Sequence, residues 1–337
     1  MESDFLSCDW GTTSFRLRRA SEVDGKVIRE IREHAGVKKL HAEVEAGAGR
    51  SNVFGQFLSR QLETLLAGGT PPKRALPLVI SGMASSSIGW REIPYARAPF
   101  HLDGRGLRSE ELAWSQPNWV GPTYLISGIA NQHDMLRGEE TEIIGLMSDP
   151  SLAALRRRSL LILPGTHSKH VWIEDDSVVD FCTFMTGELF EVLGRHSLLR
   201  ASVDVDGETG GHARALADAD HEAFQEGVRW AKDRGLAAGL FRVRTRSVLD
   251  RRSIGNNTWF MSGLLIGAEI EHIGDRAKDR PVILAATGGL SDLYSLALEI
   301  VAGSTLRWIR LPPEQVEQAT VAAHAMFLRS KVTGSKA

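Results

Sequence analysis

The 337-residue chain contains only two cysteines, Cys8 and Cys182, and each lies in an apolar, strand-like stretch. Two isolated cysteines form no metal-binding pattern, so we expect buried free thiols rather than a disulfide. The N-terminus lacks the basic-then-apolar pattern of a secretory signal, and no apolar run reaches the roughly 18 residues that a membrane helix needs. These absences predict a cytoplasmic protein with no membrane partner.

The sequence also lacks an excess of either charge. The 40 Lys and Arg residues nearly balance the 42 Asp and Glu residues, and the formal net charge is −2. Such a balance gives no reason to expect nucleic acid as a partner. The basic clusters Arg16–Arg19, Arg156–Arg158 and Arg242–Arg246 contain no interleaved aromatic residues, so we interpret them as solvated faces or local ion pairs. The length allows two domains, or one large domain with an internal division.

The first half of the chain alternates between strand and helix patterns. The stretches "DFLSCDW", "SFRLRRA" and "KVIREI" predict a three-stranded antiparallel meander, because they are separated by Gly11-Thr12 and Asp24-Gly25 turns. A helix is expected over 51–66, then a buried strand "ALPLVISGM" and an irregular insertion over 89–122 that lines a pocket. After a further strand, "PTYLISGI", we expect Asp134 to precede a helix "MLRGEETEIIGLM".

The second half begins in the same way. "SLLILPGTHSKHVWIED" predicts strand, turn and strand, and "SVVDFCTFM" predicts a third strand. Helices are expected over 186–199, about 219–236 and 258–272. Residues 281–300 predict a strand, a glycine turn and a helix, and a last helix follows Pro312-Pro313.

A Gly-Thr-x-Ser turn therefore opens each half of the chain, at Gly11–Ser14 and at Gly165–Ser168. Both turns lead into an alternating strand and then a third strand, which indicates a duplicated β-β-β-α unit. The alternative is chance similarity of two ordinary hairpins. A third glycine turn, Gly288-Gly289, leads from a strand into a helix, and this favours a ligand site, because glycine permits close approach and a helix start offers free N–H groups.

Together the three turns predict a site for the phosphates of a nucleotide, with the nucleoside at the third turn. Asp9, at the end of the first strand, is placed to hold a hydrated Mg²⁺ through its oxygen atoms, although it also suits a turn cap. Competing motifs are incomplete: there is no P-loop, no full G-x-G-x-x-G, no zincin helix and no G-x-S-x-G elbow.

Several segments of the sequence resemble a known family. The segments "DWGTTSFR", "SGM…GW.E.PY", "DMLRGEETEIIG", "LPGTHSKHVWI", "FMTGELFEVL..HS" and "SGLLIGAEI" are similar to the 2-dehydro-3-deoxygalactonokinase family, within the acetate kinase/hexokinase/actin superfamily. The sequence departs from the family pattern at "ASSSIGW" and "ISGIANQH". Both departures are expected on the sugar side of the site, so they leave the exact substrate open.

The resemblance implies an α/β fold of two duplicated, ribonuclease H-like domains, each with a mixed five-stranded sheet, and an ATP cleft between them. The N-terminal, sugar-binding domain is expected over 1–133 plus 312–330, and the nucleotide-binding domain over 134–311. The implied activity is ATP- and Mg²⁺-dependent phosphorylation of a 2-keto-3-deoxy sugar acid, with 2-dehydro-3-deoxy-D-galactonate converted to its 6-phosphate. Whether the protein forms a homodimer is left open.

The resemblance also implies roles for particular residues. Asp134 is the expected general base, although an Asp before a helix is also a common N-cap. The expected metal ligands are Asp9 and Glu139, with Glu140 as an alternative. The expected nucleotide-binding residues are Gly11, Thr12, Thr13, Gly165, Thr166, Ser168, Lys169, Gly288 and Gly289. The expected substrate-binding residues are Ser81, Met83, Ser85, Ser86 and Trp90. The candidates for the partner of the substrate carboxylate are Arg91, Arg97, Arg105 and Arg137.

Two rival functions remain at this stage. The first is a kinase for another sugar or sugar acid, or a phosphohydrolase of the same fold. The second is a nucleotide-binding regulator without transfer activity. Such regulators often carry a DNA-reading helix-turn-helix, which we do not expect ahead of the first strand, and the presence of Asp134 favours an enzyme.

Overall fold

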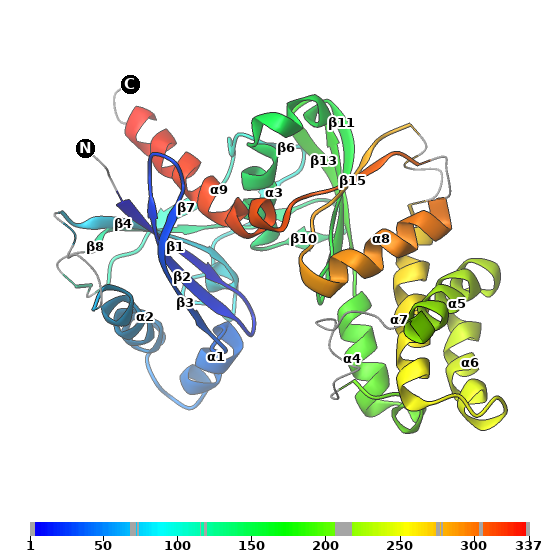
Figure 1. Cartoon of the computed structure of the whole chain (residues 1–337). Coiled ribbons are helices and arrows are strands. Elements are labelled where there is room, and N and C mark those ends of the chain that lie inside the picture. Colours follow the sequence, from blue (N-terminus) through cyan, green and yellow to red (C-terminus); the bar gives the residue numbers. More distant parts are fainter. Residues whose placement is uncertain are drawn as a thin grey trace. The chain divides into compact units, whose positions relative to one another are not determined.

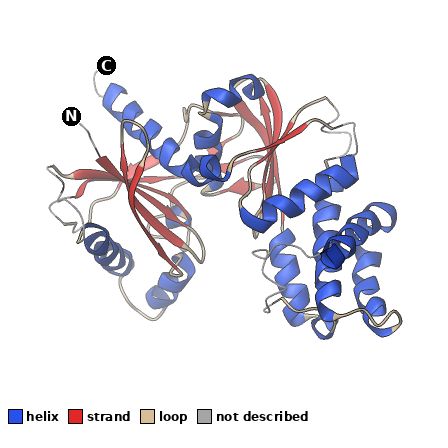
Figure 2. Cartoon of the chain, viewed as in Figure 1, coloured by secondary structure: helices blue, strands red, loops and turns tan. Residues whose placement is uncertain are grey.

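The computed structural model describes residues 4–67, 72, 74–114, 116–117, 120–205, 218–273, 277, 279–302 and 306–334. Its internal contacts divide the chain into two units. Unit 1 comprises Met1–Arg156, Asp176–Val179 and Glu317–Ala337, and unit 2 comprises Arg157–Asp175 and Asp180–Val316. Each unit contains a mixed sheet with helices packed on it (Figures 1 and 2).

The sheet of unit 1 has the strand order β3-β2-β1-β4-β8-β7. Its strands are β1 (Asp4–Trp10), β2 (Phe15–Ser21), β3 (Val27–Glu33), β4 (Leu76–Gly82), β7 (Ser109–Glu111) and β8 (Val120–Ile126). The first three form the predicted antiparallel meander. β4 is parallel to β1, and β8 is parallel to β4. The parallel step from β3 to β4 requires a crossover, which α1 (Val37–Glu45) and α2 (Arg50–Leu66) provide.

Helices cover both faces of this sheet because β1 alternates its side chains. Leu6, Cys8 and Trp10 point into a core that includes apolar residues of α1 and α2. Phe5 points the other way, into a second core with Val321 and other residues of α9 (Pro313–Gly334). Both faces of β1 are therefore covered, by α1 and α2 on one side and by α9 on the other.

The sheet of unit 2 has the order β15-β14-β11-β12-β13, and β6 pairs with the start of β13. Its strands are β11 (Arg158–Leu163), β12 (Ser168–Glu174), β13 (Ser177–Phe184), β14 (Val282–Leu284) and β15 (Trp308–Arg310). β6 (Phe100–His101) and the first residues of β13 belong to unit 1. β11 pairs antiparallel with β12 and parallel with β14, which is parallel to β15. Read from β13 to β15, this order (β13-β12-β11-β14-β15) repeats the order β3-β2-β1-β4-β8 of unit 1. The duplicated, ribonuclease H-like fold is thus confirmed. Each sheet has six strands instead of five, because a short edge strand, β7 or β6, is added.

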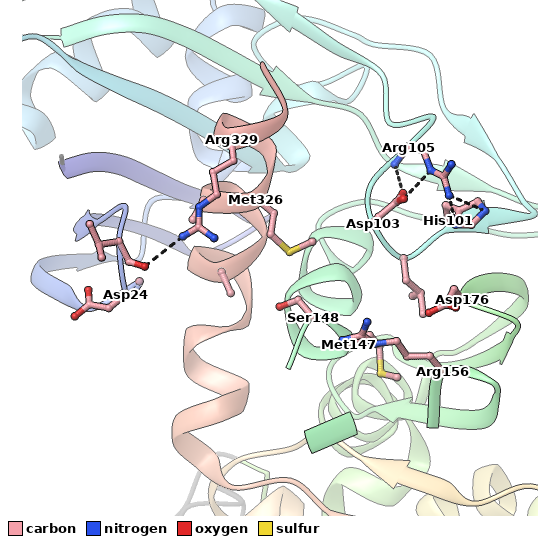
Figure 3. A pocket seen from close by; sticks show the side chains of 15 residues that line it. Asp24, His101, Asp103, Arg105, Met147, Ser148, Arg156, Asp176, Met326 and Arg329 are labelled. Carbon is pink, nitrogen blue, oxygen red and sulfur yellow. Dashed lines mark hydrogen bonds and ion pairs between the residues drawn. The ribbon is translucent and has the colours of Figure 1, made fainter. Parts of the chain in front are cut away.

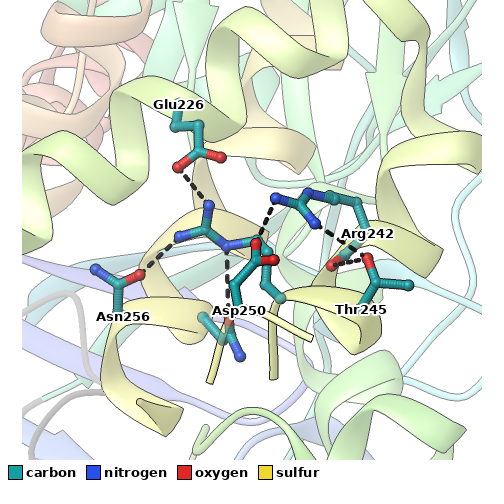
Figure 4. Close-up of polar contacts among 7 residues, drawn as sticks. Glu226, Arg242, Thr245, Asp250 and Asn256 are labelled. Atoms are coloured by element: carbon teal, nitrogen blue, oxygen red, sulfur yellow. Dashed lines mark hydrogen bonds and ion pairs between the residues drawn. The ribbon is translucent and has the colours of Figure 1, made fainter. Parts of the chain in front are cut away.

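Five helices accompany the second sheet: α4 (Thr186–His196), α5 (Asp218–Arg234), α6 (Leu236–Val248), α7 (Ile254–Glu271) and α8 (Gly288–Ala302). The basic cluster Arg242–Arg246 lies on α6 and forms ion pairs, which is one of the two predicted alternatives; Arg242 pairs with Asp250, and Arg246 is only 1% exposed. The guanidinium of Arg246 pairs with Glu226 of α5 and with Asn256 of α7, both labelled in Figure 4. A buried arginine of this kind needs such partners, and here they join three helices.

A small three-stranded sheet was not predicted, and one of its strands, β5, lies in the segment 89–122 that was predicted to be irregular. It has the order β10-β9-β5, with β5 (Ala96–Arg97), β9 (Ile129–Ala130) and β10 (Met135–Leu136). Short 3-10 helices occur at Met83–Ser85, Pro150–Arg156 and Leu198–Ala201. Both cysteines are free as predicted, but only Cys8 is buried, and Cys182 is half-buried.

The helix after Asp134 begins later than predicted. α3 spans Glu139–Met147 and its N-cap is Gly138, which has a φ of 110°. That left-handed conformation favours glycine and separates the helix from strand β10 before it. Asp134 therefore precedes a strand and does not cap α3, so the alternative role considered for it is wrong.

The boundary between the units also lies elsewhere than expected. The first long segment of unit 1 ends at Arg156 rather than at 133, and the final segment begins at Glu317 rather than at 312. The physical reason is the packing of α3 against α9. A Cβ placed on Gly145 would lie 1.7 Å from the carbonyl oxygen of Ala319. Two helices in such close contact belong to one folded body, and the absence of a side chain at Gly145 makes the contact possible.

Candidate active site

The second Gly-Thr turn lies on the N-terminus of α4. The backbone N–H of Glu188 donates a hydrogen bond to the carbonyl of Thr166. A Cβ on Gly187 would lie 2.8 Å from both the oxygen of Gly165 and the Cα of Thr166, so this contact requires glycine. Nothing lies within 4 Å of a Cβ built on Gly165. The N-terminus of α4 thus supports the turn on one side, and the side of Gly165 is open to a ligand.

A pocket of about 490 Å³ opens beside this turn, entirely within unit 2. Its lining comes from the second turn, α4, α7 and α8. The lining residues are Gly165, Thr166, Thr186, Gly187, Phe190, Glu191, Arg195, Val205, Ser262, Leu265, Ile266, Leu290 and Tyr294. The pocket combines backbone N–H groups and a helix start with an apolar wall. This is the combination that the phosphates and base of a nucleotide need.

Beneath this pocket, Glu269 of α7 joins three elements. Its side chain is 2% exposed and accepts hydrogen bonds from Ser168 (2.6 Å) and His170 (3.0 Å) of β12. It also accepts hydrogen bonds from Thr186 of α4 and from Tyr294 of α8 (2.7 Å). Burial would raise the pKa of Glu269, but the bonds from His170, Ser168 and Thr186 outweigh it and hold that pKa below its usual value. We name these five residues the Glu269 cluster.

The Glu269 cluster is the part of the site that sequence reasoning missed. Glu269 belongs to the segment "SGLLIGAEI", which the sequence analysis used only for the family resemblance. The available signal was a single acidic residue in the largely apolar stretch "WFMSGLLIGAEI". A buried carboxylate requires hydrogen-bond donors. The donors lie 83 to 101 residues before it, or 25 after it, and no local pattern reveals such contacts.

Two of the predicted phosphate ligands make hydrogen bonds within the protein. The hydroxyl of Ser168 is buried and bonded to Glu269. The ammonium of Lys169 donates to the carbonyl of His167 at 3.0 Å, and its residue is 4% exposed. Both side chains hold the turn instead of extending from it. Gly288, with a φ of 59°, and Gly289 begin α8, and the next residue, Leu290, lines the pocket.

The first Gly-Thr turn is built like the second. Its carbonyls at Gly11, Thr12 and Thr13 accept hydrogen bonds from the start of α1. A Cβ on Gly36 would lie 2.3 Å from the carbonyl oxygen of Thr12, so a glycine at the helix start again permits the contact. The side chains of Thr12 and Thr13 are exposed. In each unit, a Gly-Thr turn is thus supported by the N-terminus of a helix.

Carboxyl groups gather where β1 meets α3 in unit 1. Gly82 lies against Trp10, and Gly138 lies against Gly82, which brings the start of α3 to the end of β1. Burial raises the pKa of Asp9, and Glu139 adds to the effect. Burial and the neighbouring Glu139 raise the pKa of Glu140 to about 8.

Glu142 belongs to the same group, although the sequence analysis did not select it. Burial, followed by the charges of Asp9 and Glu139, raises its pKa to about 8. Burial is the main cause of these raised pKa values, and neighbouring carboxylates add to it. The group as a whole suits a cation. No set of three or more His, Cys, Asp or Glu side chains within the described ranges is arranged to hold a metal ion by itself.

Asp134 lies in the turn between β9 and β10 and is half-buried. Its backbone N–H donates to the side-chain oxygen of Asn131 at 2.6 Å, and its own carboxylate accepts from the N–H of Met135 at 2.7 Å. Asn131 also donates its N–H to the carbonyl of Asp134. Asn131 therefore fixes the turn, and one carboxylate oxygen of Asp134 is held by the N–H of Met135.

Most of the predicted substrate-binding residues are buried. Trp90 is 5% exposed and packs in the aromatic core against Phe54 and Trp114, so it contributes to the core and offers little surface to a ligand. The hydroxyls of Ser85 and Ser86 donate to the carbonyls of Gly82 and Met83, within one turn.

Met83 itself is half-buried. Ser81 is 1% exposed, and its hydroxyl has no hydrogen-bond partner among the described residues. Its strand register places it beside Asp9. Ser81 thus lies beside Asp9 of the carboxyl groups described above. Met83 is the most accessible of the five predicted residues.

The fold and these features define a sugar kinase of the actin–hexokinase type. The family model described as 2-keto-3-deoxy-galactonokinase matches residues 9–322. The chain therefore belongs to the 2-keto-3-deoxy-galactonokinase family, a family of sugar-acid kinases, which use ATP as the phosphoryl donor. None of the helices in the described part of the chain has the length and apolar character of a transmembrane span.

Individual relatives agree with this family. The chain is 34% identical to a probable 2-dehydro-3-deoxygalactonokinase of Rhizobium meliloti, over 88% of this chain and 89% of the relative. It is 31% identical to the 2-dehydro-3-deoxygalactonokinase of Escherichia coli, over 89% of this chain and 90% of the relative. A crystal structure described as a 2-dehydro-3-deoxygalactonokinase from Sinorhizobium meliloti superposes with a TM-score of 0.74 and 29% identity, over 96% of this chain and 99% of the other.

Proposed function

We propose that this protein transfers the γ-phosphoryl group of ATP to the C6 hydroxyl of 2-dehydro-3-deoxy-D-galactonate. The observation that carries the proposal is the pocket of unit 2, in which an open Gly-Thr turn, a helix N-terminus and an apolar wall meet. The relatives that match about nine-tenths of the chain bear the name of this kinase. The products are ADP and the 6-phosphate of the sugar acid.

On the nucleotide side, the phosphates bind to backbone N–H groups of the second turn and of the start of α4. Gly165 allows the closest approach, and the exposed hydroxyl of Thr166 is a further donor. The nucleoside packs against Leu265 and Ile266 of α7 and Leu290 of α8. In unit 1, Gly11, Thr12 and Thr13 form a turn of the same construction, with exposed threonine side chains.

On the acceptor side, the carboxylate of Asp134 is the general base. It accepts the proton of the C6 hydroxyl while that oxygen bonds to the γ-phosphorus and the bond from phosphorus to the ADP oxygen breaks. The turn fixed by Asn131 keeps the carboxylate in place. Positioning of this kind accounts for much of the catalysis of phosphoryl transfer.

The carboxyl cluster of unit 1 suits Mg²⁺. This ion keeps several waters and binds one or two carboxylates together with substrate phosphates, so it does not need a closed protein cage. Asp9 and Glu139 are the proposed ligands, directly or through water, and Glu142 adds negative charge beside them. When bound, Mg²⁺ neutralises charge on the phosphates.

The test is a coupled ADP-release screen of the purified protein across C5–C7 aldonic acids, 2-keto-3-deoxy acids and neutral sugars. We expect the highest kcat/KM with 2-dehydro-3-deoxy-D-galactonate and a strict requirement for Mg²⁺. A higher kcat/KM with another acid would reassign the substrate but keep the kinase. Binding of ATP with no turnover on any member of the panel would favour the regulator.

A further inference from the structure

The substrate of such a kinase carries a carboxylate at C1, and the sequence alone does not identify the residue that binds it. The four candidates are Arg91, Arg97, Arg105 and Arg137, all in unit 1. A carboxylate is bound best by two parallel N–H groups of a guanidinium that no other anion occupies. The structure separates the four candidates by this criterion.

Arg137 is committed to the fold. Its guanidinium lies 4.1 Å over the ring of Tyr95. One terminal nitrogen donates to the carbonyl and the hydroxyl of Ser85, both at 2.5 Å, and the other donates to the carbonyl of Ile93. Nε donates to the hydroxyl of Tyr95 at 3.3 Å. With each of its nitrogens engaged, Arg137 holds the loop that follows β4 and has no free edge for a substrate.

Arg91 and Arg105 already have carboxylate partners. The Nε of Arg91 lies 2.8 Å from Glu110, and the Nε of Arg105 lies 2.6 Å from Asp103. Figure 3 shows Arg105 also directed at His101, on the wall of a pocket of about 690 Å³. No residue of 129–136 lines that pocket, so Arg105 does not belong with Asp134.

Arg97 lies at the same end of the small sheet as Asp134, but on the opposite edge strand. In β5 it is the register partner of Ala130 in β9, and Ala130 is in turn the register partner of Met135 in β10. Arg97 ends its strand, and Asp134 immediately precedes Met135, so both lie at one end of the sheet. The row crosses two interstrand steps, about 10 Å in total.

One residue connects Arg97 with the proposed base. A terminal nitrogen of Arg97 donates to the backbone carbonyl of Asn131 at 3.0 Å, while the side chain of Asn131 accepts from Asp134. Arg97 is exposed. Its Nε and its second terminal nitrogen make no hydrogen bond or ion pair with any residue that the structure describes. These two nitrogens form the edge that binds a carboxylate in the bidentate manner.

We propose that Arg97 binds the C1 carboxylate of the sugar acid and thereby sets specificity for acids over neutral sugars. The proposal rests on the proposed function and extends it. The two groups of the substrate that matter, the carboxylate and the C6 hydroxyl, lie at opposite ends of its carbon chain. Arg97 lies on one outer strand of the small sheet and Asp134 directly precedes the other, at the same end of it. The distance between these backbone positions, about 10 Å, is one that an extended six-carbon acid and two side chains can span.

The test compares kcat/KM for the acid with kcat/KM for its neutral primary amide, in the wild type and in variants. Arg97→Ala is expected to lose about 10- to 100-fold with the acid, which is the effect of removing hydrogen bonds to a charged group. The amide is expected to react equally with wild type and variant. Arg97→Lys keeps the charge but lacks the two parallel N–H groups of a guanidinium. Its kcat/KM with the acid is expected to lie between those of the wild type and Arg97→Ala. Arg105→Ala is the matched control, and ATP affinity is expected to remain unchanged in all of them.

Three results would overturn the assignment. The first is an Arg97→Ala variant that keeps its preference for the acid. The second is an equal loss with the acid and the amide, which would show that Arg97 supports the loop and not the carboxylate. The third is a selective loss of the acid in Arg91→Ala instead. Absence of turnover in the wild type with either compound is a different result, since it contradicts the proposed function itself.

Discussion

Asp134 shows what one residue can contribute when its neighbours fix it. Its backbone is held by Asn131, and its carboxylate accepts the N–H of Met135. Replacing it with Asn keeps an oxygen that can accept the same bond, so we expect Asp134→Asn to fold normally. The variant lacks a base, however, and loss of a positioned base lowers the rate by on the order of 10²–10⁴.

The measurement for Asp134→Asn is kcat beside the melting curve, with ATP binding by calorimetry as the control. We expect a melting temperature near that of the wild type and intact ATP binding. Turnover close to normal would remove Asp134 from the chemistry and direct attention to Glu139 or Glu140.

Single residues were predictable where a residue type is typical of a turn. Gly11, Gly165 and Gly288 were selected because glycine stands at turns, and all three lie in turns or at a helix start. The orientation of polar side chains was not predictable. Ser168 and Lys169 face inward because their partners, Glu269 and the carbonyl of His167, lie beneath the turn. Hydroxyl and ammonium groups in a sequence do not reveal which of them already has a partner.

At the scale of elements, the second turn and α4 act as one support for the phosphates. Gly165→Val tests this, because space is free around its Cβ and its φ lies outside the left-handed region. We expect a folded variant with weaker ATP binding, since the side chain fills the space that the phosphates need. Calorimetry with ATP measures it, and Gly165→Ala should give a smaller effect. Equal ATP affinity in wild type and Gly165→Val would exclude this turn as the phosphate site.

The Glu269 cluster joins β12, α4 and α8, so we expect its loss to affect the nucleotide pocket. An amide offers only one accepting oxygen, so Glu269→Gln leaves donors from β12, α4 or α8 without an acceptor. Because these elements line the nucleotide pocket, we expect KM for ATP to rise about tenfold while KM for the sugar acid stays the same. Tyr294→Phe removes a single donor and is the milder control. A change in melting temperature with no change in KM for ATP would limit Glu269 to a structural role.

Elements with a clear period were predicted, and those without one were missed. The meander, α2, α5, α7 and the strand–turn–helix at Val282 follow the expected patterns. The helix α6 was missed because its buried Arg246 reads as a surface residue, and its partners Glu226 and Asn256 come from other helices. The strand β10 was assigned to a helix, since two residues carry no period. Tertiary pairing decided both cases.

For the molecule as a whole, buried histidine makes stability depend on pH. His324 of α9 is fully buried and lies 2.8 Å from the hydroxyl of Ser7 in β1. Burial, together with the charge of Arg18, lowers its pKa to about 3. Its unfolded pKa is about 6.5. As pH falls below about 6.5 the unfolded chain binds the proton first, so stability is lost from there down to about pH 3.

The loss amounts to at most about 1.4 kcal/mol per pH unit in that range. His324→Asn keeps an acceptor for Ser7 and removes the titration, so we expect a flatter dependence of stability on pH for the unfolding of unit 1. Urea denaturation between pH 7 and pH 4 measures the slope, and the exposed His34→Asn is the control. Equal slopes in wild type and His324→Asn would contradict the assignment.

The contact between Ser7 and His324 also joins residues 317 positions apart. During synthesis on the ribosome, β1 emerges long before α9, so Phe5 and its neighbours remain uncovered on one face of the sheet until α9 follows. Unit 1 therefore cannot complete its core until α9 has emerged, whereas the strands and helices of unit 2 emerge in the interval. A nascent chain that stops before α9 exposes this apolar face, which makes it a natural substrate for chaperones and proteases.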